Sequence, residues 1–118
     1  MSIDDLFRKL IEGKESAHDF AECASQLGCG MSDLFNKISV LSASKFLEGS
    51  LSFEDADGAM NGVWGAMLHY TTENNLQLVE PCYSIYCAFD EGEYDHRDGS
   101  DPVERYTRPA LEDLLKNA

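Results

Sequence analysis

Basic residues are scarce in this chain. Its 118 residues include nine lysines and arginines against 22 aspartates and glutamates, which gives a formal net charge of −13. So large an excess of carboxylates repels nucleic-acid phosphates and anionic lipids and attracts cationic partners. We therefore expect neither direct nucleic-acid binding nor membrane binding, and we expect a macromolecular partner to be basic.

Long apolar runs are absent as well. No segment approaches the roughly 18 to 20 apolar residues that a membrane-spanning helix needs. The first ten residues, MSIDDLFRKL, place two acids before the first base and contain no long apolar stretch. This is not the pattern of a secretory signal, so we expect a cytoplasmic protein. The cysteines should then be reduced, because the cytosol does not sustain structural disulfides; they are Cys23, Cys29, Cys82 and Cys87.

The chain contains no complete metal-binding motif. Its two cysteine pairs are six and five positions apart, whereas structural zinc sites favour spacings of about two to four residues. Buried thiols are therefore favoured over a zinc site. An EF-hand calcium loop starting at Asp90 or at Asp95 lacks acidic or amide ligands at its third and fifth positions. We expect no metal site, and weak divalent-ion binding by the acidic residues remains an alternative.

Catalytic motifs are also incomplete. There is no Gly-x-Ser-x-Gly elbow for a serine nucleophile. An all-α, magnesium-dependent nucleotide hydrolase would need clustered carboxylates, and the nearest array is Glu15, Asp19 and Glu22, spaced for one helical face. Asp57 and Asn61 form a second such pair, but no glycine-rich or basic phosphate cradle accompanies them. We predict that the chain is not an enzyme and needs no cofactor, with the hydrolase as a weaker alternative.

Helix start and stop signals recur along the chain. Serine followed three residues later by aspartate is a capping pattern, and glycine commonly ends a helix. We expect helices capped by Ser2, Ser16, Ser32 and Ser52, a fifth that begins near Pro81, and a short last one capped by Thr107. β-branched and aromatic residues leave a strand possible over residues 76–88. The predicted fold is all-α: one domain, residues 1–118, forming a compact bundle of five to six helices.

The fourth predicted helix contains three glycines, Gly58, Gly62 and Gly65. Each costs about 0.5 to 1 kcal/mol relative to alanine in a helix. Close packing of another segment against this face would compensate for that cost, and a ligand groove is the alternative. The core-facing residues of this helix are predicted to be Met60, Val63, Trp64 and Met67.

An acidic stretch follows the fifth helix. Residues 90–104 hold seven acids against one base, Arg97, for a local charge of −6, and the composition predicts an exposed acidic loop there, with residues 92–102 as the loop itself. Residues 51–118 carry fourteen acids and four bases, net −10, whereas residues 1–50 carry eight acids and five bases, net −3. Aromatic residues are interleaved with or flank the acids, namely Tyr83, Tyr86, Phe89, Tyr94 and Tyr106. Such a mixture is typical of a protein interface, although charge also serves solubility.

A small acidic chain with reduced cysteines and no catalytic machinery resembles the immunity proteins of bacterial toxin–immunity pairs, of the contact-dependent growth inhibition type. The segment AFDEGEYDHRDGSDPVERYTRPALEDLL, residues 88–115, is similar to a C-terminal pattern of small bacterial proteins. The resemblance implies that the chain neutralises a cognate toxin domain by occluding or reshaping its active site. Nuclease toxins act on polyanions, so the expected partner is a basic RNase or DNase domain.

We expect the toxin-binding surface to lie in the acidic stretch, with Tyr94 or Tyr106 as an anchor. Its predicted residues are Asp90, Glu91, Glu93, Tyr94, Asp95, Asp98, Asp101 and Tyr106. The alternative is another acidic interaction module, such as an adaptor, an anti-regulator or a nucleic-acid mimic. A mimic is less favoured because it should spread carboxylates over several helices, whereas here they concentrate in one loop.

Overall fold

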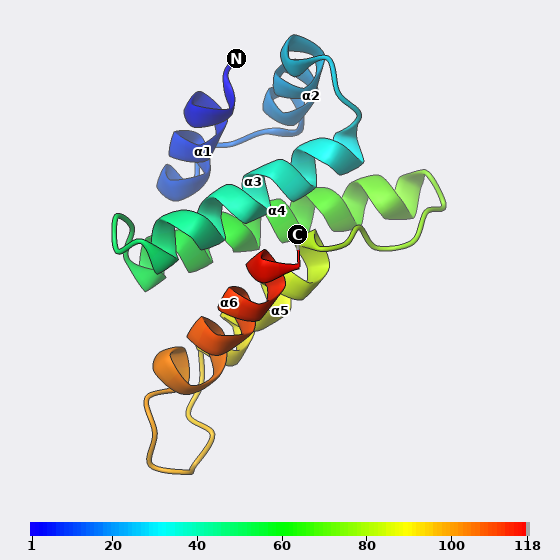
Figure 1. Cartoon of the computed structure of the whole chain (residues 1–118). Helices are drawn as coiled ribbons and strands as arrows, with labels where there is room; N and C mark the ends of the chain where they lie inside the picture. Colours follow the sequence, from blue (N-terminus) through cyan, green and yellow to red (C-terminus); the bar gives the residue numbers. More distant parts are fainter. Residues whose placement is uncertain (118) are drawn as a thin grey trace.

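The helices pack in three layers, in a computed structural model that describes residues 1–117 (Figure 1). Helices α1 (Ile3–Glu12) and α2 (Ala17–Leu27) lie against one side of the central pair, α3 (Met31–Leu47) and α4 (Phe53–Glu73). Helices α5 (Cys82–Glu91) and α6 (Arg108–Lys116) pack on the other side. A π-helical turn, η1 (Val103–Thr107), leads directly into α6.

The all-α prediction is confirmed. No strand occurs within residues 1–117, so the strand alternative for residues 76–88 is wrong. Tertiary contacts explain the outcome: α5 packs against α3, α4 and α6, and the backbone N–H of Cys82 at its start donates to the Asn36 side-chain oxygen at 3.0 Å. No helix of the described chain combines the length and the apolar composition needed to cross a membrane.

Three of the predicted helix starts are confirmed in detail. In each, a serine hydroxyl accepts a hydrogen bond from the backbone N–H three residues later, and the serines are Ser2, Ser16 and Ser52. At Ser16 the Asp19 carboxylate also accepts from the serine N–H at 2.9 Å, which completes a capping box. Gly13 and Gly28 end α1 and α2 with φ values of 70° and 68°, a conformation that glycine adopts without strain.

The predicted cap at Ser32 is wrong, whereas Thr107 stands at the predicted N-cap position of α6 but makes no capping bond. Helix α3 begins at Met31 after Gly30, so Ser32 lies inside the first turn and caps nothing. Thr107 has helical backbone angles, and its hydroxyl donates to the carbonyl oxygen of Ala88 on α5 at 2.7 Å. Its side chain is buried, and a tertiary partner has replaced the local capping bond.

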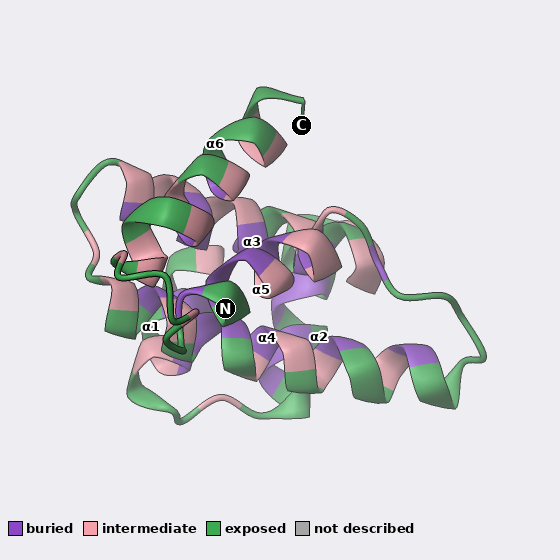
Figure 2. Ribbon diagram, turned by 90° about the horizontal axis from the view of Figure 1, so that it is seen from below, coloured by how far each residue is buried: buried purple, intermediate pink, exposed green. Residues whose placement is uncertain are grey.

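The core is built from residues on the facing sides of the helices (purple in Figure 2). Phe35 on α3 lies near its centre, with ring centroids 5.8 Å from Phe20 and 5.9 Å from Tyr70. Phe89, which the sequence placed among the interface aromatics, is fully buried and packs against Phe46 at 5.7 Å. Phe89 is therefore a core residue, and the prediction for it is wrong.

The glycines of α4 serve different purposes. A Cβ at Gly62 would lie 2.7 Å from a methyl group of Leu10 and 2.5 Å from a carboxylate oxygen of Glu15, so the predicted close packing is confirmed there. Gly58 and Gly65 face open space, and the packing explanation fails for them. Of the predicted core residues on α4, Met60, Val63 and Met67 are fully buried, whereas Trp64 is only partly buried.

The four cysteines are free thiols. Cys23 and Cys82 are fully buried, as predicted, and Cys29 and Cys87 are partly exposed. Burial raises the pKa of the Cys82 thiol to about 11 and raises the pKa of Cys23 as well. The buried pair therefore consists of neutral, unreactive thiols at neutral pH.

Candidate functional site

The acidic stretch is a folded structure rather than an unorganised loop. Helix α5 continues through Asp90 and Glu91 and η1 begins at Val103, so the loop spans residues 92–102, as the composition predicted. Within it, Asp95 accepts a hydrogen bond from the backbone N–H two residues on at 2.8 Å, and Asp98 and Asp101 do the same at 3.0 Å. These three carboxylates stabilise turns, and this role explains part of the high acid content of the loop.

Three rings stack along the loop. The His96 imidazole lies between Tyr106, at a centroid distance of 3.8 Å, and Tyr94, at 4.3 Å. The Tyr94 hydroxyl donates to the Glu91 carboxylate at 2.9 Å, and the Tyr106 hydroxyl donates to Asp98. These hydrogen bonds raise the pKa of both tyrosines. The two predicted anchors are thus held by the loop itself, and Tyr94 remains half exposed.

Asp98 is the best-satisfied carboxylate of the loop. The hydroxyl and the backbone N–H of Ser100 both donate to it, as does Tyr106, and Arg105 lies 3.4 Å away. The Ser100 hydroxyl, the Tyr106 hydroxyl and the Ser100 N–H hold the pKa of Asp98 well below its usual range. Asp98 is therefore ionised, and its carboxylate oxygens already accept hydrogen bonds from the same chain. Its role is to stabilise the loop more than to contact a partner.

The loop brings Glu93 close to Asp57 on α4, and both side chains line one hollow between the helix and the loop. Burial of Asp57 and the neighbouring carboxyl groups of Glu93 and Asp90 raise the pKa of Asp57 to about 7. Within residues 1–117, none of these three acids forms an ion pair with a lysine or arginine. We call Asp57, Asp90 and Glu93 the acidic triad. It is a cluster of like charges without a neutralising cation.

A shallow hollow of about 520 Å³ adjoins the acidic triad, between the start of α4 and the loop. Its lining combines carboxylates with apolar groups and includes Glu54, Asp57, Glu93, Asp101, Phe53 and Val103. Gly92 lines it as well, and a Cβ there would collide with the Thr107 hydroxyl and the Phe53 ring. Only glycine lets the chain turn away from α5 so close to α4 and η1.

Aromatic side chains lie on α4 and α5, the helices that carry Asp57 and Asp90. The Trp64 indole on α4 stacks on the Tyr86 ring of α5 at 4.6 Å with the planes 10° apart, and Tyr83 lies 5.5 Å from it. Burial and the charges of Asp90 and Glu93 raise the pKa of Tyr86, so the rings and the acids adjoin each other. We call this surface the acidic–aromatic face, and it consists of Asp57, Trp64, Tyr83, Tyr86, Asp90 and Glu93.

The eight predicted site residues divide among these features. Asp90 and Glu93 belong to the acidic–aromatic face, whereas Glu91, Tyr94, Asp98 and Tyr106 belong to the ring stack and its hydrogen bonds. Asp95 and Asp101 bond to turns. From the sequence, Asp57 was considered only for the hydrolase alternative and Trp64 only as a core residue, so neither was predicted at the binding surface. Their spacing of seven places them on one side of a helix, two turns apart, which is a signal that could have indicated them.

The carboxylate array considered for a hydrolase does not assemble. Glu15 precedes α2, so it does not share a helical face with the other two. Asp19 is buried, caps α2 and pairs with Lys9 at 3.2 Å, and Glu22 lies 3.5 Å from the N-terminal amine. Across the described residues, no three His, Cys, Asp or Glu side chains converge closely enough to hold a metal ion.

The acidic–aromatic face offers groups suited to binding a partner. It offers carboxylates that would accept hydrogen bonds from a cation, beside partly exposed rings on which a guanidinium or an apolar side chain can pack. Comparisons of this chain with models of protein families, with curated proteins and with solved structures find no match, so its function is inferred from this geometry.

Proposed function

We propose that this chain is an immunity protein, which binds and neutralises a basic, nuclease-type toxin domain in the cytoplasm through the acidic–aromatic face. One observation carries the proposal: Asp57 and Glu93 line one hollow beside Asp90, and none of the three has a lysine or arginine partner within residues 1–117. A cation from a partner would supply the missing counter-charge and favour the ionised form of Asp57.

The adjoining aromatic rings supply binding affinity that carboxylates alone do not. Interface hot spots favour tryptophan, tyrosine and arginine in desolvated positions. Trp64 and Tyr86 form a rigid stacked pair beside the acidic triad, so an arginine of the toxin could pair with a carboxylate while its plane packs on a ring. The charges would mainly accelerate association, and the rings would mainly slow dissociation.

Occlusion is the mode of neutralisation that this chemistry favours. A nuclease holds its polyanionic substrate with basic side chains. If the acidic–aromatic face occupies those side chains, substrate and immunity protein compete for one surface. The toxin is then inhibited without any chemical step by this chain.

The proposal is tested with the C-terminal domain of the product of the gene immediately upstream, on the order of 100 to 250 residues as domains run. Calorimetry at low and high salt would measure its binding to the full chain. We expect one-to-one binding, tighter at low salt, together with loss of nuclease activity. A basic domain that is toxic alone but does not bind this chain would contradict the proposal, as would an upstream gene without such a domain.

A further inference from the structure

A second surface, over α3 and α6, differs in character from the acidic–aromatic face. Three hollows of about 650, 600 and 440 Å³ lie along it. Leu115 lines the first two and Val40 the last two, so the hollows are neighbours along α3. We call them together the α3 groove, and its apolar lining includes Ile3, Leu27, Val40, Leu41, Leu47 and Leu115.

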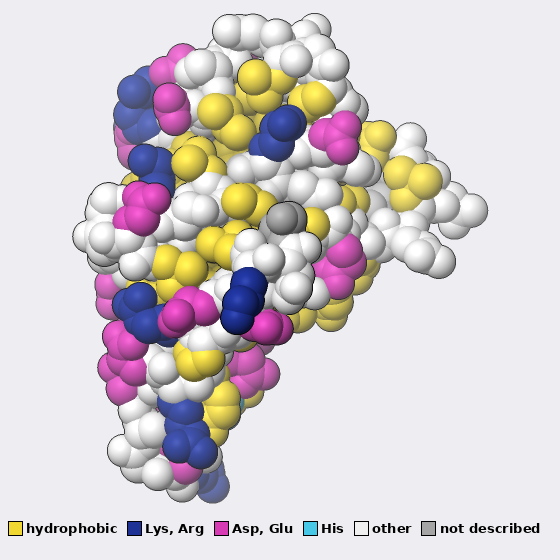
Figure 3. All heavy atoms as spheres, viewed as in Figure 1, with side chains coloured by type: hydrophobic (Ala, Val, Ile, Leu, Met, Phe, Trp, Pro, Cys, Tyr) yellow, Lys and Arg dark blue, Asp and Glu magenta, His cyan; other side chains and the backbone are white. Residues whose placement is uncertain are grey.

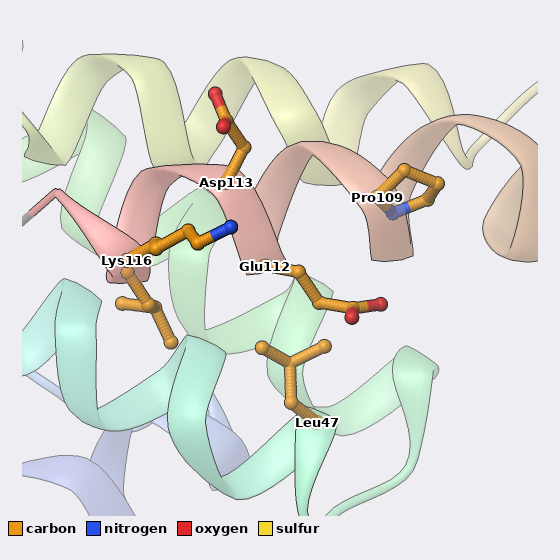
Figure 4. Close-up of a pocket in the computed structure, with 6 residues that line it drawn as sticks. Leu47, Pro109, Glu112, Asp113 and Lys116 are labelled. Carbon is orange, nitrogen blue, oxygen red and sulfur yellow. The ribbon is translucent and has the colours of Figure 1, made fainter.

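These apolar side chains are incompletely covered. Val40, Leu41, Leu47 and Leu115 are only partly buried, and Leu27 is 43% exposed. In Figure 3, hydrophobic side chains gather down the middle of this face. Figure 4 shows Leu47 of α3 rising toward α6 in one of the hollows. A contiguous apolar surface of this kind on a monomer marks an interaction site.

The charges around the groove are balanced. Two lysines, Lys37 and Lys116, line it together with three acids, Asp4, Glu112 and Asp113, for a net charge of −1. None of the five forms an ion pair within residues 1–117. The groove therefore differs from the acidic–aromatic face, whose ionised groups are all acids.

We propose that the α3 groove binds a second copy of this chain in a two-fold symmetric dimer. A two-fold interface brings one patch against itself, so the patch must be self-complementary. The α3 groove has apolar side chains at its centre and unpaired charges of both signs, so each copy offers the other both a lysine and a carboxylate. A basic toxin domain is a poor occupant, because Lys37 and Lys116 would face its own cations.

A stable dimer would bury the groove together with its flanks. A stable interface buries about 800 Å² on each partner, which is about an eighth of the 6453 Å² surface of this chain. The groove follows α3 from Asn36 to Leu47, a rise of about 17 Å along the helix. It is flanked by the start of α1 and the end of α2 on one side and by α6 on the other. An interface of standard size therefore takes in these flanking helices as well as the groove.

The dimer has a salt dependence that separates it from toxin binding. Two chains with a net charge of −13 repel each other at long range, and salt screens that repulsion. Dimerisation through a nearly neutral, apolar patch should therefore strengthen as salt rises. Binding of a basic partner to the acidic–aromatic face should weaken under the same change. The two associations are independent, and one can fail without the other.

Sedimentation equilibrium of the full chain, from low micromolar to near-millimolar concentration at low and high salt, tests the proposal without any toxin. We expect a monomer–dimer equilibrium that shifts toward dimer at high salt. Val40→Glu and the exposed substitution Lys37→Glu should each weaken it by about tenfold or more. Lys14→Glu makes the same charge change outside the groove and should leave the equilibrium nearly unchanged.

Several results would overturn the dimer. One is a monomer at every concentration and salt. Another is an equal effect of Lys14→Glu and Lys37→Glu, which would indicate repulsion between whole molecules instead of a local contact. A dimer that Trp64→Ala disrupts while Lys37→Glu does not would place the contact on the acidic–aromatic face. A monomer whose toxin binding is lost in Lys37→Glu would assign the groove to the toxin.

Discussion

At the scale of single residues, Asp57 is the side chain whose surroundings depart furthest from those of an exposed acid. Its pKa is raised to about 7 by burial and by its carboxylate neighbours, with no cation to compensate. Asp98 shows the opposite case, because hydrogen-bond donors surround it and lower its pKa. The two acids therefore have different roles. Asp98 stabilises the loop through its hydrogen bonds, whereas the Asp57 carboxyl has no cationic partner within residues 1–117 and would gain one from a binding protein.

Substituting Asp57 should make the protein more stable at high pH. Below about pH 4 this carboxyl is protonated in both folded and unfolded chains, so it contributes nothing. Between about pH 4 and 7 the folded state keeps a proton that the unfolded state releases, and the free energy of unfolding falls as pH rises. Asp57→Asn should recover about 1 to 2 kcal/mol at pH 8, after allowance for solvent screening, and little near pH 4.

Urea unfolding of both proteins at the two pH values measures this effect. Asp33→Asn is the matched control, because Asp33 is an exposed acid on α3 that forms no ion pair within residues 1–117. A gain in Asp57→Asn that does not change with pH would show that the carboxylate cluster is not destabilising.

At the scale of secondary-structure elements, the fold depends on close contacts between α4 and the segments that pack against it. Thr107, Phe53 and Gly92 meet where α5 ends, and this contact sets the direction in which the acidic loop leaves the helix. The loop then carries Glu93 back to α4. The position of Glu93 in the acidic triad therefore depends on Gly92, which has no side chain.

Gly92→Ala should be destabilising, whereas Gly65→Ala should be stabilising. A methyl group at position 92 would overlap the Thr107 hydroxyl and the Phe53 ring, and overpacking of this kind costs about 1 to 3 kcal/mol. Position 65 faces open space within α4, so alanine there should add about 0.5 to 1 kcal/mol of helix stability. Thermal unfolding of the two variants beside the parent compares them directly. Equal effects of the two substitutions would refute the close contact at Gly92.

Trp64→Ala tests the aromatic half of the face. Trp64 stacks on Tyr86 at the surface and is only partly buried, so its removal should weaken toxin binding more than it lowers stability. We expect a loss of about 2 kcal/mol or more in binding free energy, as for a hot-spot tryptophan. Tyr94→Ala, on the ring stack, is the comparison. A larger loss in Tyr94→Ala would move the interface to the loop, where the sequence alone had placed it.

The sequence predicted the elements better than the site. Ser2, Ser16 and Ser52 act through backbone groups three residues away, so their caps can be recognised locally. Thr107 stands at the predicted N-cap position of α6, but its hydroxyl bonds to Ala88, nineteen residues away, and this tertiary bond could not be recognised locally. Asp90 and Glu93 were predicted from local charge density. The spacing of Asp57 and Trp64 places them on one side of α4, but their neighbours on α5 and the loop come from tertiary packing, which the spacing does not encode.

At the scale of the whole molecule, the two described faces differ in charge and in apolar character. The acidic–aromatic face carries like charges that favour a cationic partner, and the α3 groove carries an apolar depression with nearly balanced charge. One molecule could therefore bind a toxin domain and a second copy of itself at the same time. The net charge of −13 would then serve recognition on one side and solubility over the rest.

The central claim is tested most directly by the association rate of the toxin domain at low and high salt, in stopped flow, with charge reversals on two faces. Asp90→Lys with Glu93→Lys should slow association by about tenfold or more at low salt and flatten its salt dependence. Glu48→Lys, an exposed acid at the end of α3, should have a much smaller effect. Unchanged kinetics in the double reversal, or equal slowing by Glu48→Lys, would contradict the assignment of the acidic–aromatic face as the toxin-binding surface.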